Sequence, residues 1–435
     1  MNPHDEKEAA LEVTINTISH VQREAEISLT AEELQPHFER AYRKAAPQIE
    51  VRGFRKGKVP LEMIKKLYGE AIENDALDDI ANDSFRAVLQ EKHIEPICQP
   101  AMVDMDFKRG EHFRFKIQYE VKPTFELKPY NDLAVEKPVH PVTEEELQAE
   151  LERLRRANAT MLSVTLVRDN DNHVITADVQ ELAEDGMPLI GKKTPDVKFE
   201  LADQTLVPEI RDALAHAEAG GVYRVRFSTQ HGDHTHQHYI ALTVKRIEKI
   251  ELPPFDDDFV KKITGESVTT KEEFLQRLRT DIEAYWRERS ERKLEEAIIN
   301  ELVRRHEFTV PESMVNYYLD ASVEDIKSTS RDRQLPRNFD EQRFRKETRA
   351  YATFQAKWAL IRERLLEAEQ IDVNDEDLQQ LAEKEAALHG IEKDRLLEYY
   401  KKTGSAHERV LSSKLLRRLK EYARVTERVV EEIEE

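Results

Sequence analysis

The chain has 435 residues, of which 35% are charged, and a formal net charge of −20. A chain of this length exceeds one ordinary hydrophobic core, so we expect two or three domains. No segment approaches the roughly 18 consecutive apolar residues that a membrane-spanning helix needs, and the first residues lack the apolar core of an export signal. Cys98 is the only cysteine, which excludes an intrachain disulfide and fits a reducing compartment. The sequence therefore predicts a cytoplasmic protein that has no membrane partner.

Residues 1–122 show the pattern of an α+β domain. Apolar and polar residues alternate in three segments, as they do in strands that are half buried in an antiparallel sheet. These segments are residues 11–15, 25–29 and 113–121. Thr30 followed by Glu33 is a capping box that begins a helix, and apolar residues recur at helical spacing over residues 72–88. Pro123 ends this domain.

The rest of the chain divides into a linker, a β-rich segment and a helical segment. Residues 123–163 contain several prolines, which favour extended backbone, followed by a charged helix. Short alternating segments over residues 164–248 indicate a β-rich domain. Residues 249–435 form the last segment, and from Thr270 onward we expect only helix, beginning with one long helix. Further helix boundaries are expected at Pro311, Asn374, Gly390 and Gly404.

Seven residues of the first domain concentrate positive charge. They are Arg52, Gly53, Phe54, Arg55, Lys56, Gly57 and Lys58, with four cations and no acid. A basic patch on an acidic chain is an attachment point for phosphate groups, and the two glycines allow a tight turn. The pattern predicts a loop tip with exposed cations and one aromatic side chain. A solvated turn that is basic by chance explains the charge alone equally well.

The segment Gly53-Phe54-Arg55-Lys56-Gly57-Lys58-Val59-Pro60 resembles the ribosome-docking signature of the trigger factor family, bacterial chaperones that meet nascent chains at the tunnel exit. Residues 123–161, 260–315 and 373–414 resemble the same family in order and spacing. The resemblance implies an α+β ribosome-binding domain, a β-rich middle domain similar to FK506-binding proteins, and an all-α domain of helical arms. It also implies that residues 52–58 contact ribosomal protein and rRNA of the large subunit near the exit. Nascent or unfolded polypeptides are the expected clients, and a homodimer off the ribosome is left open.

The helical segment suits a protein that shelters a flexible client. Long helices with polar outer faces, and apolar positions between the charges, bind unfolded segments weakly and without sequence preference. The candidate client-binding residues are Met314, Tyr317, Tyr318, Phe344, Tyr351 and Phe354. Aromatic side chains at helical spacing are also typical of ordinary helix packing. Both interpretations stay open.

The resemblance further implies a prolyl isomerase pocket in the middle domain, where apolar aromatic walls favour the twisted X-Pro bond. The corresponding positions are Asp178, Leu189, Leu206, Val207, Ile210, Phe227 and Tyr239. The chain departs from the family where Leu189 and Ile210 replace expected aromatic residues. We therefore expect slow isomerisation, and we expect phenylalanine at both positions to raise the rate. Residues 164–248 are also expected to carry few exposed apolar side chains.

A histidine cluster in the middle domain raises the question of a metal. His234, His236 and His238 share one face if their segment is a strand, and imidazoles on one face bind zinc or nickel. No cysteine completes the set, and an exposed polar flap explains the cluster without metal. The sequence contains no phosphate loop. It thus predicts no cofactor, and client release that needs no ATP.

Two other functions remain as alternatives. A cytosolic prolyl isomerase as the main activity requires the aromatic pocket that the middle domain lacks. A nucleic-acid-binding regulator that uses residues 52–66 requires a larger basic surface than one loop. A chaperone interpretation explains the basic loop, the helical arms and the weak pocket together.

Overall fold

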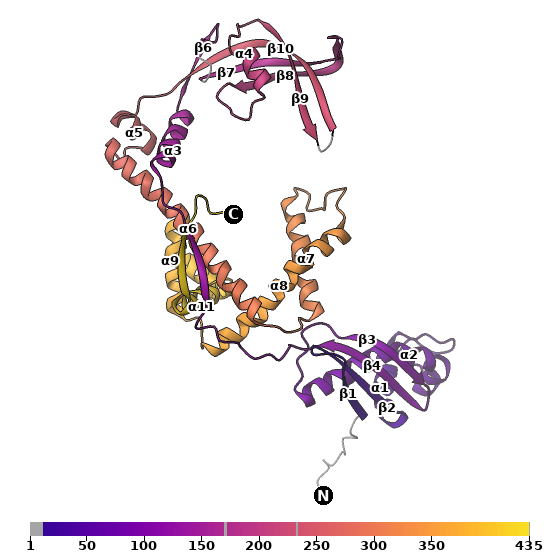
Figure 1. Cartoon of the computed structure of the whole chain (residues 1–435). Coiled ribbons are helices and arrows are strands. Elements are labelled where there is room, and N and C mark those ends of the chain that lie inside the picture. The colour runs from indigo at the N-terminus through magenta and orange to yellow at the C-terminus, as the bar shows by residue number, and fades with distance from the viewer. Residues whose placement is uncertain (1–11, 169–171, 232–233, 435) are drawn as a thin grey trace. The chain divides into compact units, whose positions relative to one another are not determined.

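The computed structural model of the chain describes residues 12–168, 172–231 and 234–434. The chain divides into two compact units (Figure 1). The first unit comprises residues 1–137 and 293–426, and the second comprises residues 138–292 and 427–435. Over the described residues, no helix is both long enough and apolar enough to span a membrane.

The first domain, residues 12–122, is a four-stranded antiparallel sheet with two helices on one face (Figure 1). Its elements are β1 (Glu12–Thr17), β2 (Gln22–Thr30), α1 (Ala31–Ala45), the short 3-10 helix η1 (Ala46–Gln48), α2 (Leu61–Lys92), β3 (Ala101–Lys108) and β4 (His112–Glu120). The strand order is β1-β2-β4-β3. The α+β pattern expected for this domain is confirmed.

Local sequence signals explain why these elements form. The Thr30 hydroxyl accepts a hydrogen bond from the Glu33 N–H, and the Glu33 carboxylate accepts one from the Thr30 N–H at 2.7 Å. This reciprocal capping box begins α1, as predicted. In β4, every second residue is at most 3% exposed, from Phe113 to Tyr119. These side chains form the core with α1 and α2, because alternate residues of a strand point to the same face.

The helical part of the first unit contains the end of one long helix and five further helices. They are α6 (Lys271–Arg305), α7 (Glu312–Thr329), α8 (Glu341–Ala368), α9 (Asp375–His389), α10 (Lys393–Thr403) and α11 (His407–Tyr422). A central cluster joins α6, α8 and α11. Four of its side chains are fully buried: Ile298, Leu302, Ile361 and Leu415. The expected boundaries are confirmed: Pro311 and Asn374 are N-caps, and Gly390 and Gly404 end helices in the left-handed conformation.

The helical pattern has one exception near the end of the chain. Residues Arg424–Val429 form strand β11, which pairs with β5 (Ala134–Val139) in a two-stranded sheet. The Arg424 N–H donates to the Leu133 carbonyl oxygen at 2.7 Å. The segment alternates valine and threonine with charged residues, and this period of two favours a strand. The expectation of helix throughout the last segment is therefore wrong for β11.

The linker that follows the first domain is held against the end of α6. The ring of Phe125 stacks on Phe308 at a centroid distance of 4.2 Å. His306 is 1% exposed, and its Nε2 accepts a hydrogen bond from the Lys128 N–H at 2.9 Å. Its Nδ1 lies 2.7 Å from the Leu302 carbonyl oxygen, so Nδ1 carries the proton and the ring is neutral.

We predict that this buried histidine makes the first unit less stable in acid. Burial lowers the pKa of His306, and the positive charges of Lys357, Lys128 and Arg305 act in the same direction. The neutral ring therefore contributes stability that is present in full above the unfolded pKa of about 6.5. That stability is lost as the pH falls below this value and through the lower pKa of the folded state. Urea unfolding midpoints measured at about pH 7.5 and about pH 5.5 should differ more in the wild type than in His306→Gln. An equal difference in both proteins would contradict the assignment.

The second unit contains a five-stranded sheet and the helices that flank it in sequence. Its elements are α3 (Glu144–Ala157), β6 (Thr160–Val164), β7 (His173–Leu182), β8 (Pro188–Glu200), α4 (Pro208–Leu214), β9 (Val222–His231), β10 (His234–Glu251), α5 (Asp257–Thr264) and the first part of α6. The strand order is β6-β10-β7-β8, and β9 pairs with β10. Ile175, Leu214 and Leu242 are among the fully buried side chains of its core. The strands of the β-rich segment begin with β6 at Thr160, before residue 164, where the sequence predicts the start. The division of the chain into four segments stays a prediction.

Candidate functional site

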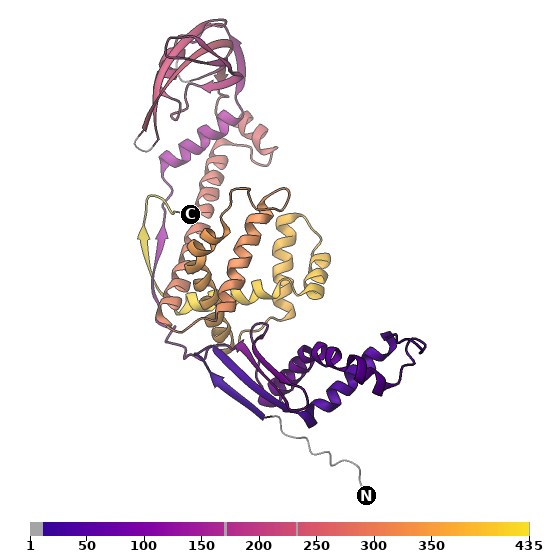
Figure 2. The same ribbon diagram turned by 90° about the vertical axis from the view of Figure 1, so that its right-hand side faces the viewer.

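The basic loop, residues 52–58, leaves the first domain between η1 and α2 at one end of the domain (Figure 2). Val59 is buried at its base with Tyr42 and Ile64, and Val51 packs against the same cluster. The Phe54 N–H donates to the Val51 carbonyl oxygen at 3.0 Å. Two anchored valines thus hold a short loop in a defined turn.

Both glycines of the basic loop have conformations that disfavour other residues. Gly53 and Gly57 have φ angles of 98° and 75°, in the left-handed region that glycine adopts without steric cost. The turn therefore favours glycine at both positions, as the sequence predicts.

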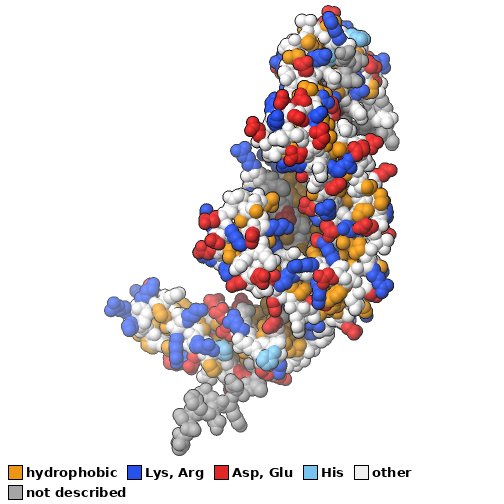
Figure 3. Space-filling model, turned by 90° about the vertical axis from the view of Figure 1, so that its left-hand side faces the viewer, with side chains coloured by type: hydrophobic (Ala, Val, Ile, Leu, Met, Phe, Trp, Pro, Cys, Tyr) orange, Lys and Arg blue, Asp and Glu red, His pale blue; other side chains and the backbone are white. Residues whose placement is uncertain are grey.

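The side chains of the basic loop are all exposed, and most of its cations have no carboxylate partner. Lys56 pairs with Glu50 at 3.0 Å. Over the described residues, Arg52, Arg55 and Lys58 make no ion pair. Phe54 lies among them and is 40% exposed. Lys and Arg side chains gather at this end of the domain, whereas acidic and basic side chains are mixed elsewhere on the face seen in Figure 3. The loop can therefore bind a polyanionic surface and place an aromatic ring against it.

A buried polar network joins the N-terminal half of α2 to α1. Glu73 is 7% exposed and accepts a hydrogen bond from the Tyr42 hydroxyl. The Arg109 Nε lies 2.6 Å from the same carboxylate. Burial, together with the hydrogen bond to Glu73, raises the pKa of Tyr42 to about 12. A Cβ atom on Gly69 would lie 2.7 Å from the Arg109 guanidinium, so glycine makes room for this network. The sequence alone did not lead to a prediction of this polar network, although a glycine inside a helix, such as Gly69, indicates close packing.

The six candidate client-binding residues divide between surface and core. Tyr317 and Tyr351 are 68% and 59% exposed. Met314 and Tyr318 pack against the cluster that joins α7 to α8, and Phe354 packs against the central helical cluster. Phe344 is half buried beside Phe339, with ring centroids 5.2 Å apart. The two exposed tyrosines are free to meet a client, whereas ordinary packing explains the other positions.

The structure also exposes apolar residues that sequence reasoning did not select. Leu388 and Ile391, at the junction of α9 and α10, are 76% and 44% exposed, and Tyr399 within α10 is 54% exposed. Leu388 and Ile391 flank the helix-ending Gly390. Helical spacing of apolar residues does not identify these two positions, because that spacing is interrupted where a helix ends.

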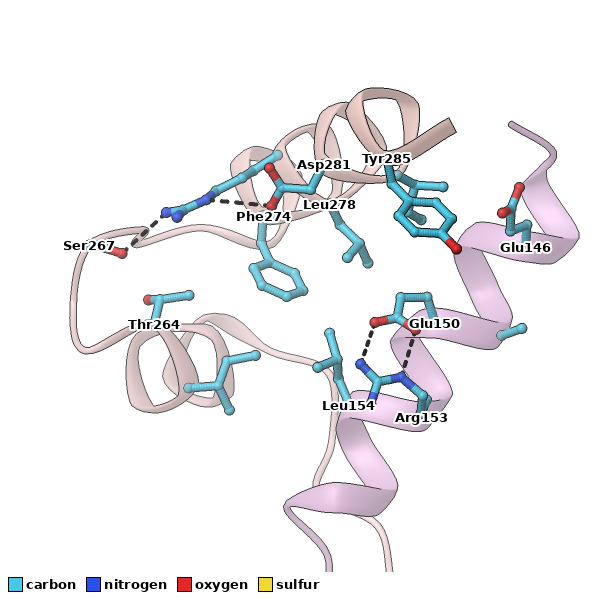
Figure 4. A pocket seen from close by; sticks show the side chains of 14 residues that line it. Glu146, Glu150, Arg153, Leu154, Thr264, Ser267, Phe274, Leu278, Asp281 and Tyr285 are labelled. Carbon is cyan, nitrogen blue, oxygen red and sulfur yellow. Dashed lines mark hydrogen bonds and ion pairs between the residues drawn. The ribbon is translucent and has the colours of Figure 1, made fainter. Parts of the chain in front are cut away.

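An apolar groove of about 870 Å³ lies between α3, α5 and the first part of α6, all in the second unit. Figure 4 shows Phe274, Leu278 and Leu154 pointing into it from α6 and α3. Tyr285 stands at one end and is 50% exposed. The apolar residues that α6 contributes to the groove recur every four residues. In the sequence, this spacing is visible as an apolar stripe along the long helix.

The charges around the groove largely compensate one another. Arg153 donates to both carboxylate oxygens of Glu150, at 2.7 and 2.6 Å, and Arg277 lies 3.9 Å from Asp281 (Figure 4). Glu146 accepts a hydrogen bond from the Trp286 Nε1–H at 2.6 Å. The groove therefore offers apolar surface with a polar rim whose own groups are already paired, which suits an apolar occupant.

The predicted isomerase pocket is not assembled as one site. Ile210 is 6% exposed in the core, and Leu206, Val207 and Phe227 pack against the same cluster. Asp178 lies 2.8 Å from the Lys193 ammonium and 2.6 Å from that of Lys245. These hydrogen bonds hold the pKa of the Asp178 carboxyl well below its usual range. The carboxylate of Asp178 is thus held by two lysines, and its residue is not part of the apolar cluster that contains Ile210.

Two further pocket positions point elsewhere. Leu189 is 39% exposed at the start of β8. Tyr239 stands opposite Arg226, whose guanidinium lies 5.4 Å from the ring centroid. Phe227 stands opposite His238 and stacks on it at 4.9 Å. Because directly opposed residues share a face and neighbours alternate, Tyr239 and Phe227 lie on opposite faces of the hairpin.

Leu189 lies on a bulge, because residues 189–192 of β8 face a single residue of β7. The neighbouring Met187 and Ile190 are 65% and 102% exposed. The expectation that residues 164–248 carry few exposed apolar side chains is therefore wrong at this point.

The histidine cluster lies at the end of the β9–β10 hairpin. The side chain of His234 is outside the described residues. His236 is exposed, and His238 contacts the Thr229 hydroxyl at 2.8 Å. Among the residues that are described, no group of three His, Cys, Asp or Glu side chains is placed to hold a metal ion. The absence of a cofactor stays a prediction.

The chain matches known proteins along most of its length. A family model described as bacterial trigger factor protein matches residues 11–154, and a second, described as its C-terminus, matches residues 270–421. The trigger factor of Salinibacter ruber is 30% identical over 417 residues, which cover 92% of this chain and 90% of that protein. The trigger factor of Chloroherpeton thalassium is 32% identical over 389 residues, or 88% and 89% of the two chains.

A solved structure described as "Promiscuous Substrate Recognition in Folding and Assembly Activities of the Trigger Factor Chaperone" has a similar fold. Its TM-score is 0.51 at 20% identity, and the match covers 94% of this chain and 98% of that one. The multidomain fold with a helical C-terminal part is therefore shared. The two family models, the two relatives and the shared fold all agree. The chain belongs to the trigger factor family.

Proposed function

We propose that the chain docks on the large ribosomal subunit near the polypeptide exit through the basic loop, and holds apolar segments of nascent chains there. Membership of the trigger factor family makes the chain a ribosome-associated chaperone whose N-terminal domain binds the ribosome. The residues that make the contact, the nature of the ribosomal partner and the cytoplasmic location are the parts that we propose.

One observation carries the docking proposal: an exposed phenylalanine stands among unpaired cations on a chain of formal net charge −20. Exposed cations that have no carboxylate partner lose little on meeting rRNA phosphate or an acidic ribosomal side chain. Arg55 can make two parallel hydrogen bonds to a phosphate, whereas Lys58 acts as a point charge. Phe54 then supplies apolar contact that is independent of salt. The two valines at the base hold the loop in place before binding, which reduces the entropy cost.

The holding proposal rests on exposed apolar surface that the fold leaves without a partner. The groove between α3, α5 and α6 and the exposed Tyr317 and Tyr351 offer such surface. A flexible client loses conformational entropy on capture, so each contact is weak and exchange is fast. Release therefore needs no nucleotide. A homodimer of the free chain stays a prediction, which sedimentation velocity checks.

We expect the chain to suppress aggregation of a refolding protein without ATP, and Ile282→Ser with Tyr285→Ser to weaken that protection. These two substitutions reduce the apolar surface of the groove at positions that are half buried and 50% exposed, respectively. The measurement is light scattering of a chemically denatured protein diluted into buffer with each variant at equal molarity. Val103→Ser with Met105→Ser is the matched control, because these side chains are 48% and 49% exposed outside the groove. Protection that depends on added ATP, or equal loss in both variants, would contradict the proposal.

A further inference from the structure

A second loop of the chain concentrates positive charge. The helices α7 and α8 pack together through a small apolar cluster, and residues 330–340, here called the arm loop, join them at one end of the pair (Figure 1). Residues 327–346, which contain this loop, carry seven cations against three acids on a chain of formal net charge −20. Neither the docking surface nor the holding surface described above includes the arm loop.

The arginines of the arm loop differ from those of the helix that follows. Arg331, Arg333 and Arg337 are exposed, and within the described part of the chain none of them makes an ion pair. The arginines in the first turns of α8 all pair with acids of α7 or α8: Arg343 with Glu347 at 2.8 Å, Arg345 with Asp320 at 2.6 Å and Arg349 with Glu312 at 2.6 Å. The lack of a partner is therefore a property of the arm loop and not of arginine on this pair of helices.

The two acids of the arm loop are engaged by the loop itself. Asp332 accepts hydrogen bonds from the Ser330 hydroxyl and, at 3.3 Å, from the Gln334 N–H. Asp340 is the N-cap of α8 and accepts a hydrogen bond from the Arg343 N–H at 3.0 Å. Both carboxylates thus shape the backbone of the loop, and neither pairs with one of its arginines.

Two turns give the arm loop a defined backbone. Arg333 has a φ angle of 53°, in the left-handed region that residues other than glycine rarely adopt. Its N–H donates to the Ser330 carbonyl oxygen at 3.1 Å, and the Phe339 N–H donates to the Pro336 carbonyl oxygen at 2.9 Å. A strained backbone of this kind is common where a loop presents side chains to a ligand. Because the turns form before binding, they reduce the entropy cost of a contact.

Charge without an apolar anchor favours phosphate over a protein partner. The apolar side chains of the arm loop, Leu335 and Phe339, are half buried, and the Phe339 ring packs on Phe344. A protein partner would gain most of its affinity from exposed apolar or aromatic anchors, which residues 330–340, all of them described, do not present. RNA carries a phosphate at every nucleotide, and a guanidinium group binds phosphate through two parallel hydrogen bonds. The loop therefore suits the RNA backbone and not a base sequence.

We propose that the arm loop binds the phosphate backbone of RNA through Arg331, Arg333 and Arg337. The contact is weak and independent of nucleotide sequence, because three charged contacts without base recognition supply only a salt-dependent attraction. It goes beyond the proposed function, since it does not require docking through the basic loop. The RNA is either rRNA beside the docked chain or free RNA, and ribosome binding distinguishes these two sources.

The test measures binding of a fluorescein-labelled oligouridine of about 20 nucleotides by fluorescence anisotropy at several salt concentrations. The full-length variant Arg331→Gln, Arg333→Gln, Arg337→Gln should bind it at least about tenfold more weakly than the wild type at about 50 mM salt. The slope of log K against log salt concentration should become shallower by about 2, because each phosphate contact on a single strand contributes about 0.7. The same loss should appear in a chain that also carries alanine at residues 54–56.

Two further variants separate the arm loop from charge in general. Arg287→Gln, Arg292→Gln and Arg304→Gln remove the same charge from exposed positions of α6, and this control should bind oligouridine like the wild type. Lysine at the three positions of the arm loop should keep the salt dependence and lose part of the affinity, because the charge remains while the paired hydrogen bonds are lost. Unchanged affinity and slope of the glutamine variant, or an equal loss in the α6 control, would overturn the inference.

A polyglutamate peptide with the same label separates phosphate from carboxylate. A glutamine variant that binds the peptide more weakly but keeps its affinity for oligouridine would overturn the inference in favour of an acidic polypeptide partner. Co-sedimentation with purified ribosomes assigns the source: severalfold weaker binding of the glutamine variant assigns rRNA, and unchanged ribosome binding together with weaker oligouridine binding assigns free RNA. A wild type that binds ribosomes but not oligouridine would overturn this inference and leave the proposed docking intact.

Discussion

Replacing Phe54, Arg55 and Lys56 by alanine should remove the chain from ribosomes while leaving its fold intact. All three side chains are exposed at the tip of the basic loop, so they contribute little to the core. The triple variant loses an aromatic anchor and two charged contacts, for which we expect a cost of about 4 kcal/mol, or about a thousandfold in affinity. The measurement is co-sedimentation of the full-length chain with purified ribosomes. Wild-type binding should also weaken as salt rises, because the contact releases counterions.

A matched control separates the basic loop from charge in general. Arg86→Ala, Lys92→Ala and Met105→Ala remove the same number of cations and one exposed apolar side chain from other parts of the first domain. This variant should sediment with ribosomes like the wild type. A loop variant that also sediments like the wild type would show that the docking assignment is wrong. Equal binding of the wild type to free RNA would instead favour a nucleic-acid-binding regulator.

Prolyl isomerase activity on short peptides should be at least about 100-fold below that of an FK506-binding domain with a complete aromatic pocket. Catalysis there requires a dry pocket lined by aromatic side chains. In this chain the Asp178 carboxylate is paired with two lysines, Leu189 is exposed on a bulge, and Tyr239 lies on the face opposite Phe227. The positions that should line one pocket are thus dispersed. The measurement is the rate of cis-trans conversion of a proline tetrapeptide.

Phenylalanine at positions 189 and 210 should not restore the rate, contrary to what the sequence predicts. Ile210 is 6% exposed in the core, so a larger ring there overpacks its surroundings at about 1–3 kcal/mol. A ring at position 189 would stand on the exposed bulge. A wild-type rate close to that of the complete pocket, or a large gain on double substitution, would contradict this account.

The parts of the fold that depend on local signals were predictable from the sequence. The capping box at Thr30 and Glu33, the alternation in β4 and the glycine stop at Gly390 each act within a few residues. A side-chain cap or a period of two determines the local backbone whatever the distant surroundings. The exposure of the basic loop follows for the same reason, because its glycines and charges exclude it from a core.

The parts that depend on distant partners were not predictable. Strand β11 forms because β5, almost 300 residues earlier in the chain, supplies its hydrogen bonds. Glu73 is buried beside Tyr42 and Arg109, which form a hydrogen bond and an ion pair with its carboxylate. The face on which Tyr239 lies is determined by the register between β9 and β10, and a shift of one residue would reverse it. Register, burial of charge and bulges are tertiary properties that a single sequence does not reveal by periodicity.

Photo-crosslinking from position 54 tests the central claim most directly. A benzophenone side chain in place of Phe54, in the full-length chain bound to purified ribosomes, should form adducts with protein or rRNA of the large subunit beside the polypeptide exit. The same group at Met105, which is 49% exposed on β3 of the same domain, should form few adducts. Adducts from position 105 with none from position 54, or adducts only with the small subunit, would contradict docking through residues 52–58.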